Sequence, residues 1–249
     1  MRLSPNDALR LLAIDVETLF TLDADGRIAR ENDPDHPAPP RLFLAGGSGG
    51  VIVRLRRDVS AGIARQVLDL ADACRGWPES EEPPAFAAAF IACLGGDRPS
   101  EDAVIHVIHQ IPPCVVRESS TRFIDSDTPA GDDMIARLTG EGMPAPLRQA
   151  GFLSPADFWP PWCVALDGEE VASIAFAARI GEHGAEIGVY TLPECRGRGL
   201  AAAVTARWSA LPALELRALF YSARTTNRPS RRVIERLGLP RIGASLRIA

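Results

Sequence analysis

The sequence predicts an α/β fold in which helices pack against a sheet. Segments with the two-residue alternation of strands recur along the chain between segments with the three- and four-residue apolar spacing of helices. The clearest example is the stretch 185–211, which reads as a strand, a glycine-rich loop and a helix. A hydrophobic content of 46% and a charged content of 24% are typical of an ordinary globular protein.

The composition further predicts a cytoplasmic protein with no membrane partner and no metal. No apolar run reaches the roughly 20 residues needed to span a bilayer, and the N-terminus MRLSPNDALR lacks the apolar core of a signal peptide. The five cysteines are widely spaced and form no CxxC pair, so they indicate neither a disulfide framework nor a zinc site. Cys195, beside the glycine-rich loop, is either a partly exposed thiol or a small side chain that fills a turn.

The first hundred residues are expected to form an N-terminal α/β domain of unknown role, which covers a substrate cleft or binds a partner. Ser4 followed by Pro5 is typical of a helix start. The stretch Gly95–Asp102, GGDRPSED, is the predicted domain boundary and gives domains 1–100 and 101–249. The elements expected before it are a helix over Ser4–Phe20, a hairpin of Phe20–Leu22 with Arg27–Ala29, strands over Arg41–Ala45 and Val51–Arg56, and helices over Ser60–Cys74 and Ala85–Leu94.

The second part of the chain has a regular order of elements. After two strand-like segments and two short helices, the pattern becomes strand, strand, strand, helix, strand, helix, strand. The expected elements are strands over Ala103–Ile111 and Cys114–Ser120, helices over Asp127–Thr139 and Met143–Ala150, strands over Trp162–Leu166, Val171–Ala178 and Ala185–Thr191, a helix over Leu200–Leu211, a strand over Leu216–Ser222, a helix over Asn227–Leu237 and a strand over Ser245–Ile248.

The glycine-rich loop is a candidate anion site. Gly197 and Gly199 allow a tight turn and a close approach of the backbone to a ligand. The helix start that follows carries unpaired N–H groups and the positive end of the helix dipole, and phosphate is the anion most often bound there. Arg196 and Arg198 lie at the mouth of this loop.

The charge distribution agrees with an anionic ligand. The sequence contains no lysine; residues 1–195 carry 16 arginines against 30 acids, whereas residues 196–249 carry 11 arginines against two acids. A ligand that carries phosphate groups would suit the basic segment, because the guanidinium fork matches phosphate geometry. Nucleic acid is disfavoured as a partner, since no aromatic stacking stripe or recognition motif accompanies the arginines.

The segment RGRGLA, Arg196–Ala201, resembles the acyl-CoA pyrophosphate loop of the GNAT (general-control-related) N-acetyltransferase superfamily, Q/R-x-x-G-x-G/A. A second signature, N-x-x-S-x-x-V-x-x-x-L-G-L over Asn227–Leu239, stands in register with it. The resemblance covers 160–249 firmly and 103–160 loosely. It implies a mixed, mostly antiparallel sheet flanked by helices, with residues 1–100 as an additional segment. It also implies that the Ala185 and Leu216 strands part to admit the pantetheine arm.

The resemblance implies acetyl-CoA as co-substrate and direct acetyl transfer to an amine. Glu186 is the candidate general base, and the alternative is an edge carboxylate that faces solvent. Many relatives carry a tyrosine that protonates the leaving thiolate where this chain has Ile234. Tyr221 or Ser222 is the candidate for that general-acid role here. Alternatively, Tyr221 is an ordinary buried strand residue and the thiolate leaves without a dedicated acid. The expected cofactor-binding residues are Val189, Tyr190, Thr191, Arg196, Gly197, Arg198, Gly199, Leu200, Ala201, Ser222, Asn227, Ser230 and Arg231.

The sequence therefore predicts an acetyl-CoA-dependent N-acetyltransferase. The alternative from another class is a non-catalytic acyl-CoA-binding regulatory or interaction module. The amine acceptor, a small molecule or a protein amine, is left open, as is the formation of a homodimer.

Overall fold

The computed structural model describes residues 3–74, 76–77, 86–95, 103–112 and 121–249. The strand-like segment Cys114–Ser120 and all of the expected boundary except Gly95 lie outside these residues. The division into domains 1–100 and 101–249 therefore stays a prediction.

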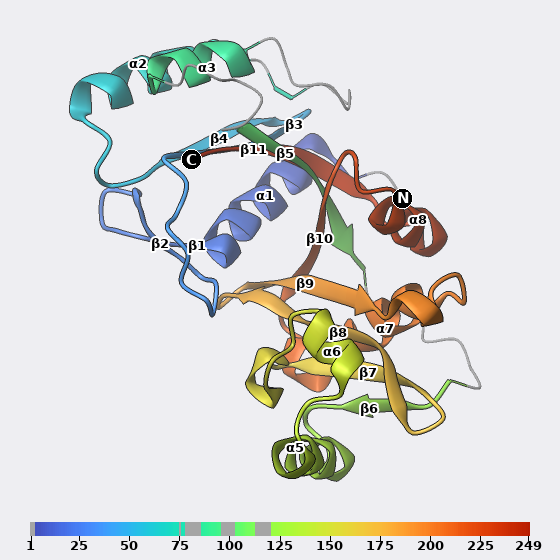
Figure 1. Ribbon diagram of the computed structural model, residues 1–249. Coiled ribbons are helices and arrows are strands. Elements are labelled where there is room, and N and C mark those ends of the chain that lie inside the picture. Colours follow the sequence, from blue (N-terminus) through green and yellow to red (C-terminus); the bar gives the residue numbers. More distant parts are fainter. Residues whose placement is uncertain (1–2, 75, 78–85, 96–102, 113–120) are drawn as a thin grey trace.

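One mixed sheet runs through most of the described chain (Figure 1). Its strand order is β4-β3-β11-β5-β10-β9-β8-β7-β6, and a separate hairpin pairs β1 with β2. Within the described residues every neighbouring pair of the large sheet is antiparallel except β9 and β10. The predicted fold class, a mostly antiparallel sheet flanked by helices, is confirmed. The strands are β1 Phe20–Leu22, β2 Ile28–Glu31, β3 Leu42–Gly47, β4 Gly50–Leu55, β5 Ala103–Ile111, β6 Phe123–Asp125, β7 Trp162–Asp167, β8 Glu170–Ile180, β9 Gly184–Thr191, β10 Ala218–Arg224 and β11 Arg241–Ile248.

The helices begin where the sequence places capping residues. The side chains of Ser4, Ser60 and Thr128 each accept a hydrogen bond from a backbone N–H of the first turn that follows. The α-helices are α1 Pro5–Leu19, α2 Ala61–Asp72, α3 Ala87–Cys93, α5 Pro129–Glu141, α6 Ala145–Gln149, α7 Leu200–Trp208 and α8 Arg228–Leu237. Short 3₁₀ turns cover Pro155–Asp157, Pro193–Cys195 and Pro212–Leu214. Within the described residues no helix has both the length and the apolarity to cross a membrane.

The sheet differs from the expected order in one place. The strand that precedes α5 and pairs with β7 is the three-residue β6, which the sequence pattern did not predict. The predicted strand β5 lies far from β7, between β10 and β11. A strand of three residues is too short for its alternation to be visible, and the neighbours of a long strand are set by non-local pairing.

The two faces of the sheet are covered by different helices. Along β3, Leu42 and Leu44 pack in one core with α2 and α3, whereas Phe43 and Ala45 pack in another core with α1. This alternation follows from the two-residue period of a strand. Figure 1 shows α1 across the middle of the sheet and α2 with α3 above β3 and β4.

Helix α7 covers the β7–β9 part of the sheet on the face opposite α1. The Cys163 thiol on β7 donates to the Val204 carbonyl of α7, and Cys163, Ala175 and Val189 lie on one face by register. Gly184 of β9 faces α1 instead, because a Cβ there would lie 2.1 Å from the Thr18 hydroxyl. Side chains two residues apart share a face, so Glu186 and Tyr190 point to the α1 side.

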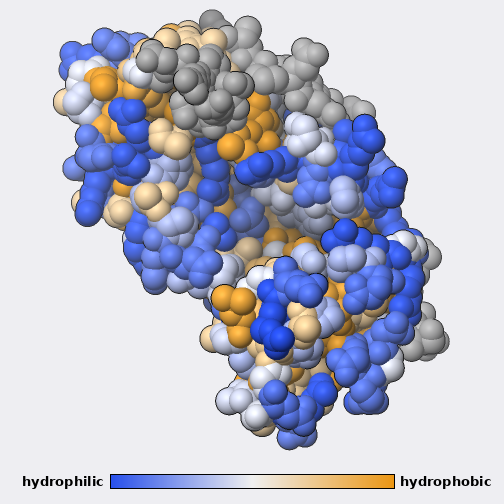
Figure 2. All heavy atoms as spheres, in the orientation of Figure 1, coloured by the Kyte–Doolittle hydropathy of each residue, from blue (hydrophilic) through white to orange (hydrophobic). Residues whose placement is uncertain are grey.

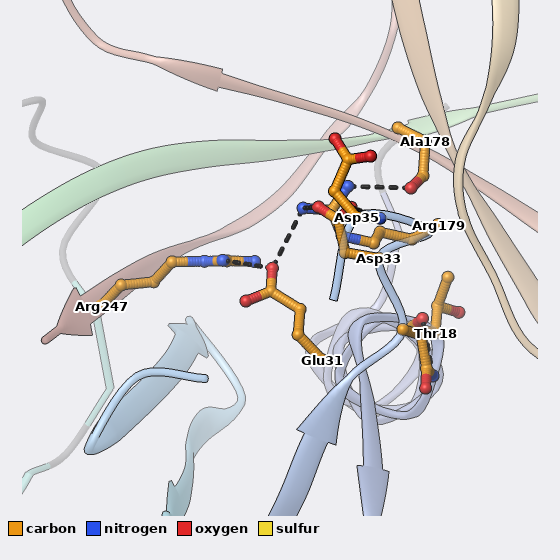
Figure 3. A network of polar contacts seen from close by, with 8 residues as sticks. Thr18, Glu31, Asp33, Asp35, Ala178, Arg179 and Arg247 are labelled. Atoms are coloured by element: carbon orange, nitrogen blue, oxygen red, sulfur yellow. Dashed lines mark hydrogen bonds and ion pairs between the residues drawn. The ribbon is translucent and has the colours of Figure 1, made fainter. Parts of the chain in front are cut away.

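A buried ion network connects the N-terminal elements to the sheet (Figure 3). Glu31 at the end of β2 accepts hydrogen bonds from Arg179 of β8 at 3.0 Å and from Arg247 of β11 at 2.8 Å. Arg179 also pairs with Asp33. The Arg247 guanidinium lies 5.4 Å from the ring centre of Phe20. Residues from three distant parts of the chain are thus held together on the α1 side of the sheet.

Candidate functional site

The strands β9 and β10 part at one end. Their parallel pairing runs from Gly184 with Ala218 to Glu186 with Phe220, after which β9 continues to Thr191 and β10 to Arg224 without further pairing between them. The expected parting of these two strands is confirmed. It leaves the edge of β9 beyond Glu186 available to an extended ligand.

The glycine-rich loop lies at the open end of this gap. Gly197 and Gly199 have φ values of 79° and 81°, the left-handed region that favours glycine. Gly199 is the N-cap of α7 and provides no side-chain cap. The first-turn N–H groups of α7 are therefore available to an anion, as the sequence predicts. Leu200 is buried and Ala201 half-buried, so the first turn is held against the core.

The arginines of the loop are already engaged within the protein. Arg196 donates from Nε to the Thr191 carbonyl at 3.2 Å, which ties the loop to the end of β9. Arg198 forms a two-bond ion pair with Asp167 of the β7–β8 turn, at 2.5 and 2.9 Å. Half-exposed, this pair can exchange for a phosphate at low cost.

Arg236 of α8 reaches the loop, although the sequence reading did not include it. A Cβ built on Gly199 would lie 2.9 Å from the guanidinium carbon of Arg236. The sequence contains a signal for this residue, because arginines recur every four residues at 228, 232 and 236 and therefore share one face of the helix.

The α8 residues that were predicted to bind the cofactor do not lie together. Asn227 is the N-cap and accepts a hydrogen bond from the Ser230 N–H at 3.2 Å. Arg231 lines a small cavity with His109 and Arg241, between α8 and β5, and not the loop side that Arg236 occupies. Burial and the neighbouring Arg241 lower the pKa of His109 to about 4, so the imidazole is neutral near pH 7.

The predicted β9 residues line the gap with their backbone. Ser173 of β8 donates its hydroxyl to the Tyr190 carbonyl at 3.0 Å and also lies 2.7 Å from the Thr191 hydroxyl. These contacts fix the β8 side of β9. Val189 points to α7, and the Tyr190 ring points to the opposite face.

Glu186 lies where the two strands separate. It is half-buried on the α1 side, directly opposite Arg179 in the β8 register. Asp15 of α1 is 0% exposed, and neither of its carboxylate oxygens has a hydrogen-bond partner within the described structure. Burial raises the pKa of Asp15 well above its usual value, the charge of Glu186 raises it further, and Arg247 acts in the opposite direction. The N-terminal helix therefore brings a second carboxyl to the candidate base.

Tyr221 and Glu186 point to opposite faces of the sheet. Glu186 pairs with Phe220, and the next residue of β10 alternates to the α8 side. Burial raises the pKa of Tyr221, and the Ser230 hydroxyl partly offsets this. Ser222 returns to the Glu186 face, where its hydroxyl is buried without a hydrogen-bond partner in the described residues. A polar ligand group between the strands would satisfy that hydroxyl.

Cys195 is buried within the 3₁₀ turn before the loop, and burial raises the pKa of its thiol. The interpretation as a small side chain filling a turn is therefore correct, and the one as a partly exposed thiol is wrong. In the part of the chain that the structure describes, no group of three or more His, Cys, Asp or Glu could hold a metal ion.

An Asp15→Asn substitution should change how stability depends on pH. Because the folded-state pKa of Asp15 is raised, its contribution to stability is fully present below the unfolded pKa and is lost as the pH rises toward the folded value. Each pKa unit of such a shift costs about 1.4 kcal/mol above that range. Urea unfolding at acid and neutral pH should show the variant gaining stability relative to wild type as the pH rises. The exposed Asp25→Asn is the control, and parallel behaviour of the two variants would contradict the assignment.

If acetyl-CoA is the anionic ligand of this loop, as the sequence predicts, a Gly199→Ala substitution should weaken its binding at least about tenfold, which is about 1.4 kcal/mol. Alanine at position 199 would have to adopt a φ of 81°, which is disfavoured for a residue with a Cβ. The new Cβ would also clash with the Arg236 guanidinium, so the loop must move. Calorimetric titration measures the effect. Gly142→Ala, at φ 84° with no atom within 4 Å of the Cβ, carries the same backbone strain away from the loop. Equal affinities for the two variants would show that the loop geometry does not matter.

Comparison with known families agrees with this geometry. Residues 162–243, which contain the parted strands, the loop, α7 and α8, match the family model described as GNAT acetyltransferase. The resemblance of the C-terminal part of the chain to the GNAT superfamily is thus confirmed. The match covers about a third of the sequence, and no curated protein matches the chain.

Several solved structures are similar to all or part of this chain at low sequence identity. A GNAT-family protein from Novosphingobium aromaticivorans has 19% identity over 60% of this chain and 66% of its own, with a TM-score of 0.41. An acetyltransferase of the GNAT family from Colwellia psychrerythraea has 13% identity over 100% and 97%, with a TM-score of 0.45. A tandem GNAT protein from the clavulanic acid biosynthesis pathway has 16% identity over 99% and 97%, with a TM-score of 0.44. These values are too low to indicate a shared function.

Proposed function

We propose that the chain is an acetyl-CoA-dependent N-acetyltransferase that transfers an acetyl group directly to an amine. The observation that carries the proposal is the parting of β9 from β10 beside an uncapped, glycine-rich helix start. The unsatisfied Ser222 hydroxyl in the same gap supports the fit of a long ligand with polar groups. Acetyl-CoA supplies the activated acetyl group when bound.

The residues of this chain would divide the work between binding and proton transfer. The first-turn N–H groups of α7, with Arg196, Arg198 and Arg236, would hold the pyrophosphate. The free edge of β9 from Val189 to Thr191 would orient the pantetheine arm, and Asn227 and Ser230 would flank it. Holding both reactants in the gap would lower the barrier by several kcal/mol, within the about 7–11 kcal/mol that orientation can supply.

Glu186 would accept the proton of the amine, directly or through a water. It is the half-buried carboxylate at the point where the strands separate, on the α1 side of the sheet. Tyr221 is a weaker candidate for the acid, since it is buried on the other face next to Ser230. Ile234 is buried and has no ionisable group. Departure of the thiolate would then rely on solvent or on Tyr221 after a local movement.

The second candidate is a non-catalytic acyl-CoA-binding module, and the buried Tyr221 together with Ile234 favours it. Titration with acetyl-CoA should show micromolar binding or better for both candidates, which is about −8 kcal/mol. Release of free thiol from acetyl-CoA in the presence of an amine panel separates them. Turnover with any amine supports the transferase, whereas binding without turnover supports the module. Absence of binding would contradict both.

A further inference from the structure

An aromatic surface lies beside Glu186 on the same face of β9. The residues Trp159, Phe176 and Tyr190 are each half-buried, whereas Phe152 beside them is buried. Trp159 lies 5.5 Å from Phe176, edge to face. The ring of the buried Phe152 lies between Phe176 and Tyr190, with its centre 5.8 Å from the Phe176 ring centre and 6.0 Å from that of Tyr190. We call Trp159, Phe176 and Tyr190 the aromatic wall.

Gly188 lets this wall approach the strand that carries the candidate base. Phe176 is the register partner of Gly188, and a Cβ on that glycine would lie 2.4 Å from the Phe176 ring. The ring therefore occupies the space of the missing side chain. Since Gly188 follows Glu186 by two residues, the wall begins about 7 Å along β9 from the carboxylate residue.

The charged side chains around Glu186, beside the aromatic wall, include more acids than arginines. Glu186, Asp15, Glu31 and Asp33 face two arginines, Arg179 and Arg247. Even with Asp15 protonated, the acids outnumber the arginines, which favours a positively charged group at Glu186. Figure 2 shows the surface hollowed between the upper part of the molecule and the lower part formed by α5, α6 and the β6–β9 strands.

We infer that the acceptor is a primary amine joined by a short chain to an aromatic ring. The ammonium group would approach Glu186, and the ring would pack edge to face on the aromatic wall about 7 Å away, a separation that a two-carbon linker spans. Such ring pairs contribute about 0.5–1.5 kcal/mol beyond the apolar area that they bury. The inference rests on the proposed function, since it names the acceptor of the same site.

Calorimetric titration tests the inference without requiring turnover. Tryptamine and n-hexylamine, both primary amines with an apolar body, are titrated into the protein saturated with coenzyme A. Tryptamine should bind at least tenfold more tightly. In Trp159→Leu this preference should fall to threefold or less, whereas Leu68→Ala, which shortens an exposed side chain on α2, should retain it. Equal affinity of the two amines for the wild-type protein would overturn the inference.

Thiol release with the same two amines separates the two hypotheses. A kcat/KM tenfold higher for tryptamine than for n-hexylamine supports the aromatic wall. In Trp159→Leu this preference should disappear because KM for tryptamine rises while kcat is unchanged. Turnover with equal kcat/KM for both amines overturns the inference and leaves the transferase function intact. Preferential binding of tryptamine with no turnover of any amine keeps the aromatic site and removes the transferase function. Because the wild-type comparison needs no variant, a poorly folded Trp159→Leu would not prevent the test.

Discussion

Replacing Glu186 with glutamine is expected to lower kcat for amine acetylation by about 10²–10⁴-fold, the usual contribution of a positioned general base. Glutamine has nearly the same shape but cannot accept the proton. Acetyl-CoA affinity should be retained, because the loop, α7 and α8 that would hold the cofactor are at the other end of the gap. Steady-state thiol release measures kcat, and calorimetry measures the affinity.

A matched control is available on the same hairpin. Glu182 lies in the β8–β9 turn with its side chain 87% exposed, and its substitution by glutamine should leave kcat unchanged. Unfolding curves for both variants establish that they are folded. An unchanged kcat in Glu186→Gln would remove this residue from the mechanism and leave the edge-carboxylate interpretation.

The same reasoning explains which parts of the fold the sequence could predict. The order of strands, loop and helices from Trp162 to the C-terminus depends on local patterns, such as the apolar spacing of the helix predicted over Asn227–Leu237 and the glycines at 197 and 199, and this order was predicted correctly. The insertion of β5 between β10 and β11 depends on pairing between distant segments. No local period carries that information.

The candidate site divides in the same way. The loop residues are contiguous in sequence, so their grouping follows from the motif itself. Asp15 reaches Glu186 only because α1 packs across the parted strands, and its isolated position in an apolar helix gives no hint of a partner. Arg236 could have been predicted from the four-residue repeat on α8. The opposite orientations of Tyr221 and Glu186 require the β9–β10 register, which the sequence does not contain.

Replacing Glu31 with alanine is expected to destabilise the protein by about 3–5 kcal/mol, the cost of leaving buried charges without their partner. Glu31 is 4% exposed and accepts from Arg179 and Arg247, which are only 16% and 23% exposed. The loss should lie toward the lower end, because Asp33 still pairs with Arg179. Urea unfolding of the whole chain measures the change.

The matched control is an ion pair that lies exposed on the protein surface. Glu169 pairs with Arg122 at 2.7 Å, with side chains 77% and 58% exposed, and Glu169→Ala should cost less than about 1 kcal/mol. Glu31→Gln keeps the volume of the side chain and removes only its charge, so most of the loss should persist in that variant. A loss in Glu31→Ala no larger than in Glu169→Ala would show that the buried network contributes little.

The consequence for the site follows from the position of Arg179. This residue is the register partner of Glu186, and Glu31 holds its guanidinium on the N-terminal side of the network. Without Glu31, Asp33 is the remaining ion-pair partner of Arg179 among the described residues, and the less restrained guanidinium can turn toward Glu186 and weaken the basicity of the carboxylate that would accept the amine proton. We therefore expect Glu31→Ala to lower kcat as well as stability, and Glu31→Gln to do the same. Retention of full kcat at a temperature where both variants are folded would show that Glu31 stabilises the fold without positioning the site.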